Sequence, residues 1–560
     1  MAKIFSIVFK SFDIAIRYNK RIQKTYSWLE SEFGKETKLK TINNGEIFHF
    51  LVGYNEDLNI DVNKGLLGFT NSEDWYKKNI YPDGNYFIYK LFKEEIELNS
   101  DFTGSRNIWY YFTYDYFIFS SIQIPIIIFK ESFKLNSHMF GWMLSSGSLG
   151  PENSWDNEIK ILPRASILRF NFKDYIVRIQ DASDFDFIDS YFFKGSKNIL
   201  NGSIEKNIES LKISKERTLH LLSGGIESRF LFHSLALKKN LPCLTWTTKE
   251  GKNSINSDYA VSKTLKESFG ITHFDYIIDD QIQDPGMIFD NFLKFGEGRI
   301  DHIFSYLDNF RLWRELAEKN ITSVIRGDHN FGRYKTYSEK QSKKSLGCLM
   351  YSDIRVDFFN EIAKSQNLPL FLNKKLSENL DEYSARLGLD FRLPYVNSSL
   401  NDLKLTFVEI NNPLLNNSLV QFSKKLDPKY LLNKSLLKSI NDIKIKGVPY
   451  AKSHYTENND YVFEKYFKEF IVGRIEYNLD LGYFPKLGFD EFEINKLRNR
   501  LIKVRSKKKS HFNLKEILPK SIKKFLNQFK SENVSDIRIA FRLVLIIEMV
   551  NKINKLTQNQ

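Results

Sequence analysis

The chain has 560 residues, of which 42% are hydrophobic, and it carries a formal net charge of +14. Its length supplies material for at least two cores, because a domain takes about 150 residues. Two cysteines in so long a chain exclude a disulfide scaffold and a zinc ribbon. We expect no N-terminal signal, because residues 1–18 mix charged with apolar side chains, and we expect a cytoplasmic protein.

The first 200 residues are predicted to form a β-rich domain. Short aromatic and β-branched runs alternate there with turn signals, which is typical of strands. These runs are residues 86–89, 109–112, 116–119 and 124–129. The most apolar window, 110–129, contains Asp115 and Pro125 and alternates in polarity, so it is predicted to be a pair of strands and not a membrane span.

A glycine-rich turn joins an apolar strand at 217–222 to a helix that runs from residue 229. Paired glycines permit unusual backbone dihedrals and let N–H groups approach an anion at the positive end of a helix. Serine hydroxyls can donate to phosphate oxygens, and Glu227 offers Mg²⁺ a hard oxygen ligand. The turn is predicted to bind pyrophosphate through Ser223, Gly224, Gly225, Ile226, Glu227 and Ser228.

Strand and helix patterns alternate after this turn. Strand-like runs at 241–248 and 274–279 flank a helical pattern, and a third run at 323–326 ends in Gly327 and Asp328. Such alternation predicts an α/β domain with a doubly wound parallel sheet and ligands at the carboxyl ends of its strands. Cys243 falls in one predicted strand, and we expect both it and Cys348 to serve only core packing.

The turn resembles the SGGxDS loop of the ATP pyrophosphatase family, whose members split ATP to AMP and pyrophosphate. Later segments follow in the order found in one branch of that family, the asparagine synthetase-like enzymes. The segments that carry this resemblance are residues 241–248, 294–313, 323–334, 383–395 and 433–438. The resemblance implies ATP and Mg²⁺ as cofactors.

The resemblance also implies roles for single residues. Thr245 lies in the strand whose backbone binds adenine, and Gly327 lies in a second ATP-binding segment. Asp328 joins Glu227 as a metal ligand, and the catalytic residues are Lys434 and Glu297. Lys434 would reach the α-phosphate, where a compact ammonium can follow moving charge. Glu297 would contact the substrate amine or the acyl-adenylate.

Four positions depart from the family pattern. Glu227 replaces an Asp, Arg229 a Ser, His329 a Glu and Asn397 an Asp. A neutral imidazole suits Mg²⁺ poorly, because that ion prefers oxygen ligands. The departures at Glu227, His329 and Asn397, together with the absence of an N-terminal Cys, support an alternative of another class, a non-catalytic nucleotide-binding scaffold.

The β-rich region also carries family-like pieces. Residues 82–86, 101–106 and 161–164 resemble parts of the Ntn-hydrolase-like glutaminase domain of asparagine synthetase. That domain uses an N-terminal Cys as nucleophile, whereas this chain begins Met1-Ala2-Lys3. We therefore expect no glutamine hydrolysis. The implied organisation is a degenerate glutaminase-like domain at 1–200, an ATP pyrophosphatase domain at 201–490 with a helical C-terminal part, and a basic helical extension at 491–560.

The predicted function is that of an ATP-dependent ligase, which activates a carboxylate as its acyl-adenylate and transfers the acyl group to an amine. In lacking this nucleophile the chain resembles the lasso-peptide cyclases and the beta-lactam synthetases, in which the amine belongs to the substrate. A macrocyclase with a precursor peptide and a protease as partners is therefore one alternative. Ammonia-dependent amidation of a small molecule or sugar acid is another.

Part of the excess positive charge lies in the basic run 496–509 and the lysines that follow it. Such a run can face nucleic acid, as in a tRNA-modifying adenylase of the same loop family. No RNA-binding module is visible beside it, and solvated lysines are the simpler interpretation. We therefore expect no nucleic-acid partner.

Overall fold

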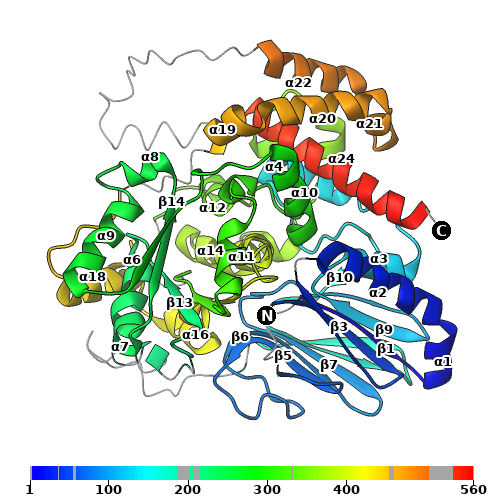
Figure 1. The fold of residues 1–560 in the computed structure, drawn as a ribbon, viewed down its shortest axis with the longest axis horizontal. Helices are drawn as coiled ribbons and strands as arrows, with labels where there is room; N and C mark the ends of the chain where they lie inside the picture. Colours follow the sequence, from blue (N-terminus) through cyan, green and yellow to red (C-terminus); the bar gives the residue numbers. More distant parts are fainter. Residues whose placement is uncertain are drawn as a thin grey trace.

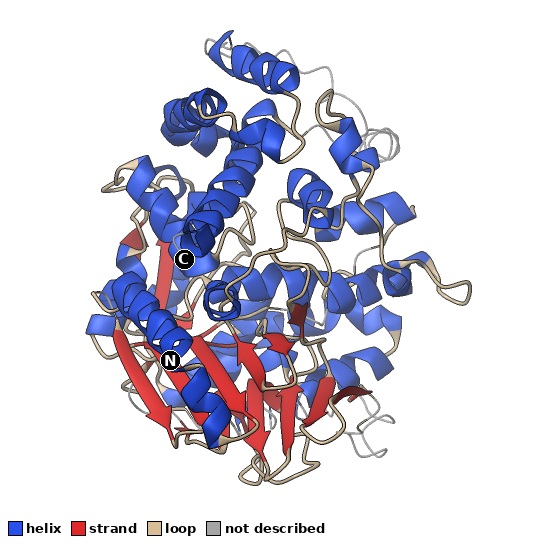
Figure 2. Ribbon diagram, turned by 90° about the vertical axis from the view of Figure 1, so that its right-hand side faces the viewer, coloured by secondary structure: helices blue, strands red, loops and turns tan. Residues whose placement is uncertain are grey.

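The computed structural model describes the chain except for residues 1–2, 36, 55–58, 184, 186–201, 203, 206–207, 210, 212, 329–331, 334, 453–458, 504–533 and 559–560. Figure 1 shows three regions: a β-rich region that contains the N-terminus, a parallel sheet with its helices, and a helical layer that contains the C-terminus. In Figure 2 the strands gather in the lower part of the molecule, and helices form most of its upper part.

The β-rich region consists of two six-stranded antiparallel sheets. One sheet has the order β10-β8-β9-β1-β3-β2 and the other β12-β11-β7-β6-β5-β4. The first contains β1 (Lys3–Phe9), β2 (Lys38–Asn43), β3 (Ile47–Gly53), β8 (Trp109–Phe112), β9 (Tyr116–Ser120) and β10 (Lys160–Ile161). The second contains β4 (Asn59–Ile60), β5 (Lys64–Thr70), β6 (Gly84–Leu91), β7 (Glu95–Ser100), β11 (Ser166–Asn171) and β12 (Ile176–Asp181).

Apolar side chains from both sheets form one core, in which Leu51 and Phe117 of the first sheet join Phe87 and Leu98 of the second. The two sheets therefore pack face to face as a sandwich. The same region contains the helices α1 (Phe12–Arg17), α2 (Asn19–Phe33) and α3 (Ile124–Lys130), whereas α4 (His138–Ser146) lies higher, in contact with α24 (Asp536–Gln558) (Figure 1). The strands predicted at 86–89, 109–112 and 116–119 are confirmed as parts of β6, β8 and β9.

The strand predicted at 124–129 is wrong, because these residues form α3. Pro125 occupies the first turn of α3, where a proline needs no N–H partner. The carboxylate of Glu297, far along the chain, accepts hydrogen bonds from the N–H groups of Gln123 and Ile124 at 2.7 and 2.9 Å. Every residue of α3 is buried, so tertiary packing overrides the β propensity of its isoleucines.

The second region is built on a five-stranded sheet of order β15-β14-β13-β16-β17, in which all pairings are parallel, as predicted. Its strands are β13 (Thr218–Leu221), β14 (Cys243–Thr247), β15 (His273–Ile277), β16 (Ser323–Ile325) and β17 (Glu409–Asn411). The chain moves outward from β13 to β15 on one side and then from β16 to β17 on the other. The order therefore reverses between β13 and β16, and ligands of such sheets bind at the carboxyl ends beside that point.

Helices and helical turns surround the parallel sheet (Figure 1). Between the strands lie α6 (Ile226–Leu231), the π-helical η2 (Phe232–Ala236), α7 (Leu237–Lys239), α8 (Lys249–Lys252), α9 (Asp258–Phe269), α10 (Pro285–Gly296), η3 (Ile303–Tyr306), α11 (Arg311–Glu318), α12 (Glu339–Leu346), η4 (Tyr351–Asp353), α13 (Asn360–Ala363), η5 (Leu370–Leu372), α14 (Leu380–Leu387), the π-helical η6 (Gly388–Asn397) and α15 (Ser398–Asp402). After β17 follow η7 (Pro413–Leu415), α16 (Asn417–Lys425), α17 (Pro428–Leu431) and α18 (Ser435–Lys444). Cys243 and Cys348 are both buried, and burial raises the pKa of each thiol to about 12, in line with core packing.

The helical layer contains α19 (Asn459–Val462), the π-helical η8 (Phe463–Phe467), α20 (Lys468–Asp480), α21 (Tyr483–Lys486), α22 (Glu491–Lys503) and α24 (Asp536–Gln558). Residues of α24 such as Phe541, Leu543 and Leu545 are fully buried, and α24 contacts α3, α4, α20 and α22. The last helix thus belongs to the main core. No described helix is both long and apolar enough to cross a membrane. The basic run beyond Lys503 lies outside the described residues.

Buried and half-buried ion pairs join the sandwich to the parallel-sheet region. They are Lys3 with Asp402 (3.0 Å between Nζ and Oδ2), Arg106 with Glu409, and Arg164 with Asp390. Backbone groups contribute as well, because Asn417 Nδ2 donates to the carbonyl of Pro82 at 2.8 Å. The Ser418 N–H donates to Asp83 Oδ1 at 3.0 Å. The segments 82–86, 101–106 and 161–164 therefore all face this interface.

Candidate functional site

The glycine-rich turn lies at the carboxyl end of β13 and leads into α6. Ser223 Oγ and Ser228 Oγ lie 2.7 Å apart, and the Ser223 hydroxyl accepts a hydrogen bond from the Gly225 N–H at 3.2 Å. The Gly224 N–H donates to Asp258 Oδ1 at 2.8 Å. These bonds close the turn on itself and tie it to the start of α9.

The glycines serve close packing and not unusual dihedrals, which corrects the prediction. Gly225 has φ −76°, and Gly224 is absent from the left-handed region as well. A Cβ on Gly224 would lie 2.5 Å from that of Ala451. A Cβ on Gly327, which follows β16, would lie 2.8 Å from the backbone nitrogen of Ser228. The turns after β13 and β16 thus touch where the strand order reverses.

Buried polar side chains of the parallel sheet form hydrogen bonds to the backbone of the turn at residues 222–228. His220 Nε2 lies 2.9 Å from the Ser228 carbonyl, and burial lowers the pKa of His220 to about 4, so the ring is neutral and donates. The Thr245 hydroxyl lies 2.7 Å from the Leu222 carbonyl and 2.8 Å from His273 Nε2. Thr245 therefore supports the turn with its side chain, while its predicted adenine contact involves its backbone.

Glu227 and Lys434, predicted separately as metal ligand and catalytic residue, lie together. Lys434 Nζ is 2.5 Å from Glu227 Oε1, and both side chains are largely buried. Lys434 adopts left-handed dihedrals with φ 60° immediately before α18, which packs on α6. A salt bridge between residues so far apart in sequence fixes α18 against the turn.

Asp328 is the second predicted metal ligand and follows Gly327 directly. Its Oδ1 pairs with Arg326 Nε at 3.0 Å, while its Oδ2 is buried without a hydrogen-bond partner in the described structure. An unpaired buried carboxylate oxygen costs free energy unless something binds it. His329, whose imidazole was expected to weaken metal binding, lies outside the described residues.

No three His, Cys, Asp or Glu side chains gather into a metal site in the described parts of the chain. Glu227 Oε1 accepts no directed hydrogen bond there despite its ion pair, and Asp328 Oδ2 is unpaired. These two carboxylates fit Mg²⁺ only if Lys434 leaves Glu227 and a bound polyphosphate supplies further oxygen ligands.

Three cations near Asp328 were not predicted as site residues. Arg326 follows β16, Arg392 lies in η6, and Lys404 follows α15. Burial lowers the pKa of Lys404 to about 7, and the charge of Arg326 adds to that effect while Asp328 opposes it. A lysine and an arginine within the largely apolar stretch 387–408 are the signal that sequence reasoning could have used.

Arg229, the residue that directly follows Ser228, has a structural role. Its guanidinium donates to the carbonyls of Val448 and Pro449 at 2.7 and 2.5 Å. It also stacks on the ring of Tyr450, 4.1 Å from the centroid. Arg229 therefore holds residues 448–451 over the turn, where the Ala451 N–H donates to the Gly224 carbonyl at 3.2 Å.

Glu297 lies apart from this group. It is fully buried at the end of α10, with φ 51°, and its carboxylate caps α3. Its carbonyl accepts from Trp155 Nε1 at 2.7 Å. Burial raises the pKa of this carboxyl, against the opposing charge of Arg299. None of its hydrogen bonds or ion pairs with described residues reaches the turn.

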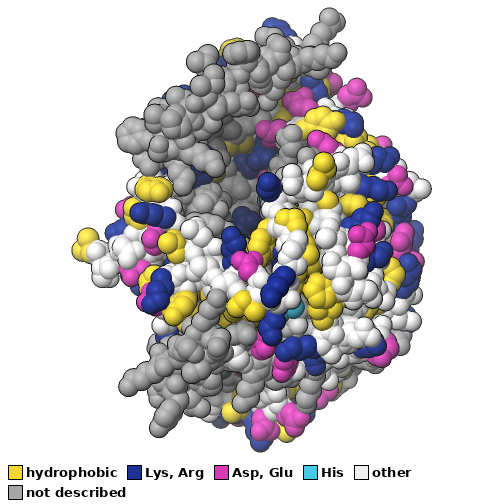
Figure 3. All heavy atoms as spheres, turned by 90° about the vertical axis from the view of Figure 1, so that its left-hand side faces the viewer, with side chains coloured by type: hydrophobic (Ala, Val, Ile, Leu, Met, Phe, Trp, Pro, Cys, Tyr) yellow, Lys and Arg dark blue, Asp and Glu magenta, His cyan; other side chains and the backbone are white. Residues whose placement is uncertain are grey.

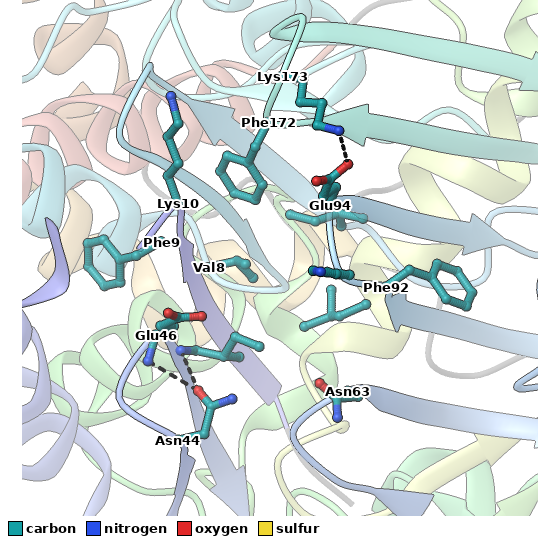
Figure 4. A pocket seen from close by; sticks show the side chains of 14 residues that line it. Val8, Phe9, Lys10, Asn44, Glu46, Asn63, Phe92, Glu94, Phe172 and Lys173 are labelled. Atoms are coloured by element: carbon teal, nitrogen blue, oxygen red, sulfur yellow. Dashed lines mark hydrogen bonds and ion pairs between the residues drawn. The ribbon is translucent and has the colours of Figure 1, made fainter. Parts of the chain in front are cut away.

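Two cavities lie elsewhere. One, of about 650 Å³, opens at an end of the sandwich near Phe9, Lys10 and Phe172 (Figure 4). Lys173 there pairs with Glu94 at 2.6 Å, and no Ser, Cys or His lines it. The other, of about 530 Å³, has a mainly apolar lining around Leu219 and Phe274, beside the amino ends of the parallel strands. Neither contains a residue predicted for the site.

The chain matches no family model, and no curated protein is significantly similar to it. Function is therefore argued from the site itself. The structure brings Glu227, Ser228, Gly327, Asp328 and Lys434 to one place at the carboxyl edge of the sheet, and it leaves Glu297 outside. Figure 3, which views the molecule from the side of α8 and α9, shows a hollow with Lys and Arg side chains on its walls.

Proposed function

We propose that the protein is an ATP-dependent amide-forming ligase of the asparagine synthetase type, which activates a carboxylate as its acyl-adenylate. The observation that carries the proposal is the Lys434–Glu227 ion pair against the closed serine–glycine turn, beside the point where the strand order reverses. A cation, a carboxylate and N–H groups at that edge suit a polyphosphate.

In the proposed reaction an oxygen of the substrate carboxylate attacks the α-phosphorus of ATP, and the bond from that phosphorus to pyrophosphate breaks. The amine nitrogen then attacks the acyl carbon, AMP leaves, and the amine loses a proton. Ser223, Ser228 and the first N–H groups of α6 would hold the pyrophosphate portion. Mg²⁺, held by Glu227 and Asp328, would neutralise phosphate charge.

Lys434 would stabilise the charge that develops on the phosphate during attack. Its ammonium can do so only after leaving Glu227 Oε1, 2.5 Å away. Opening of this pair on nucleotide binding frees Glu227 for the metal and Lys434 for the phosphate. The closed pair is therefore the resting form of the proposed site.

The proposal includes no glutamine hydrolysis. The sandwich segments 82–86, 101–106 and 161–164 form bonds to residues 390–418 instead. The amine would be free ammonia or part of the substrate, as in a macrocyclase that acts on a precursor peptide. The roles of Glu297 and of the adenine-binding strand at Thr245 remain predictions.

The test is ATP binding by calorimetry and Mg²⁺-dependent pyrophosphate release with candidate carboxylates and cell extract. The wild type is compared with a Ser223→Ala, Glu227→Ala variant and with a Ser31→Ala, Glu361→Ala control, whose side chains are exposed. Pyrophosphate and AMP from the wild type and control alone would support the ligase. Absence of ATP binding in the wild type would overturn it, and ATP binding without turnover would favour the scaffold.

A further inference from the structure

Two leucines in one loop are almost completely exposed. The leucine loop, as we call it, comprises residues 368–378 between α13 and α14 and includes η5. Leu370 is 88% exposed and Leu376 is fully exposed, while Phe371, next to Leu370, is 38% exposed. Single apolar side chains are ordinary on a protein surface, but several large ones in one loop mark an interaction site.

Side chains of α14 hold the backbone of the leucine loop in place. Leu372 is fully buried and anchors the loop in the core. The Tyr383 hydroxyl donates to the Leu372 carbonyl at 3.1 Å. Arg386 donates to the Asn373 carbonyl at 2.7 Å and also to the Phe371 carbonyl. The fold therefore fixes the loop backbone, and the exposure of the leucines belongs to this fixed conformation.

Two lysines lie between the leucines in the sequence, and neither forms an ion pair with a described residue. Lys374 Nζ donates to the Lys375 carbonyl at 3.3 Å, and Lys375 is exposed. Glu378, the acidic residue of the loop, is bound by Arg386, whose Nη2 lies 2.9 Å from Glu378 Oε2. The same oxygen accepts from the Lys375 N–H at 3.0 Å. The loop therefore presents an excess of positive charge beside its leucines.

This combination suits a lipid bilayer better than a protein partner. A stable protein interface buries about 800 Å² on each partner, which one loop does not supply. At a bilayer surface, a few apolar side chains enter the boundary of the acyl chains, and neighbouring lysines attract anionic head groups. The formal net charge of +14 adds a long-range attraction of the same sign.

We propose that the leucine loop docks the protein on anionic membrane surfaces. Leu370 and Leu376 would enter the bilayer interface, and Lys374 and Lys375 would bind the anionic head groups. None of the bonds that hold the loop involves the turn at 223–228. The inference is therefore independent of the proposed ligase function.

The test is co-sedimentation of the full chain with vesicles of phosphatidylcholine alone and with vesicles that also contain phosphatidylglycerol. We expect the wild type to partition at least tenfold more strongly onto the anionic vesicles. Leu370→Ser, Leu376→Ser should reduce this partition at least tenfold at an unchanged Tm, because both side chains are exposed. Lys374→Gln, Lys375→Gln should remove most of the preference for anionic lipid.

The matched controls carry the same changes elsewhere on the surface. Ile255→Ser, Phe492→Ser replaces two other strongly exposed apolar residues, and Lys20→Gln, Lys263→Gln replaces two other exposed lysines. Both controls should bind vesicles as the wild type does.

Equal partition of the wild type onto the two kinds of vesicle would overturn the inference. Equal partition of the leucine variant and its control would also overturn it, because the attraction would then come from the basic chain as a whole. A third contrary result is a wild type that ignores vesicles and dimerises in light scattering, while the leucine variant is a monomer. The loop would then bind a second copy of the chain and not a membrane.

Discussion

Two parts of the chain carry the motifs singled out in the sequence, and the structure uses their polar residues in opposite ways. In the sandwich, Asp83, Arg106 and Arg164 are engaged with the parallel-sheet region through ion pairs and hydrogen bonds. At the carboxyl edge of the parallel sheet, Asp328 Oδ2 and Arg392 lack partners in the described structure. A motif whose polar groups are satisfied internally stabilises the fold, whereas one that leaves them unsatisfied points to a ligand.

The contrast is one of energetics. A buried pair such as Arg106–Glu409 does not need a ligand, and losing one partner strands the other. Unpaired buried polar groups lower the stability of the folded state, and a ligand that pairs with them offsets this cost. Substitutions in the sandwich should therefore reduce stability, and those at the sheet edge should reduce binding.

The largest effect on stability is expected from Glu409→Ala, which leaves the buried guanidinium of Arg106 unpaired. We expect the free energy of unfolding to fall by about 3–5 kcal/mol, measured by urea denaturation. An Arg106→Leu, Glu409→Ala double variant should recover much of that loss, because the stranded charge is gone. A single variant within 1 kcal/mol of the wild type would contradict an interface role for the sandwich pieces.

Acid should destabilise both regions through buried neutral histidines. Burial lowers the pKa values of His49 in the sandwich and of His220 below the turn from 6.5 to about 4. The unfolded chain therefore binds protons between pH 6.5 and 4 that the folded chain does not, so stability is full above pH 6.5 and falls toward pH 4. Each residue contributes on the order of 3 kcal/mol to this fall.

Unfolding free energies measured from pH 7 to pH 4 check this pH dependence. His49→Gln and His220→Gln should each remove about one proton from the slope in that window. Only His220→Gln should also weaken ATP binding, because only His220 supports the Ser228 carbonyl. An unchanged slope in both variants would contradict the assignment.

A substitution of Glu297 tests whether this predicted catalytic residue stabilises the fold or takes part in the reaction. Glu297→Ala removes the acceptor of two N–H groups at the start of α3 and should cost about 2–3 kcal/mol of stability. If its role is structural, ATP-dependent pyrophosphate release should persist in the folded fraction. Loss of amide product in a Glu297→Gln variant of unchanged Tm would restore the catalytic role.

Local sequence patterns predicted what depends on neighbours in the chain. Strands β6, β8 and β9, the parallel strands β13 to β16 and the turn at 223–228 follow from periodicity and glycine placement, whereas β17 was not predicted. What the sequence could not show depends on distant contacts. Residues 124–129 became a helix capped by Glu297, and Arg229 gained its role from carbonyls at 448 and 449.

The contacts of the charged site residues also depend on distant parts of the chain, so the sequence could not predict them. Lys434 was predicted from its segment, but its contact with Glu227 depends on how α18 packs on α6. Arg392 and Lys404 stand out only by their apolar neighbours in the sequence, which does not show which acidic group they face. Their importance appears only when β16 places Asp328 beside them.

The smallest effect is expected from Thr245→Val, which separates support of the turn from contact with nucleotide. The variant keeps the shape of the side chain and loses the hydroxyl, which bonds to the Leu222 carbonyl and to His273 Nε2. The loss should cost about 1 kcal/mol of stability. If the strand binds adenine through its backbone, as the resemblance implies, the Kd for ATP should change less than threefold. A tenfold weaker Kd at unchanged Tm would mean that the hydroxyl itself contacts the nucleotide, and Thr245 would then belong with the unsatisfied groups of the sheet edge.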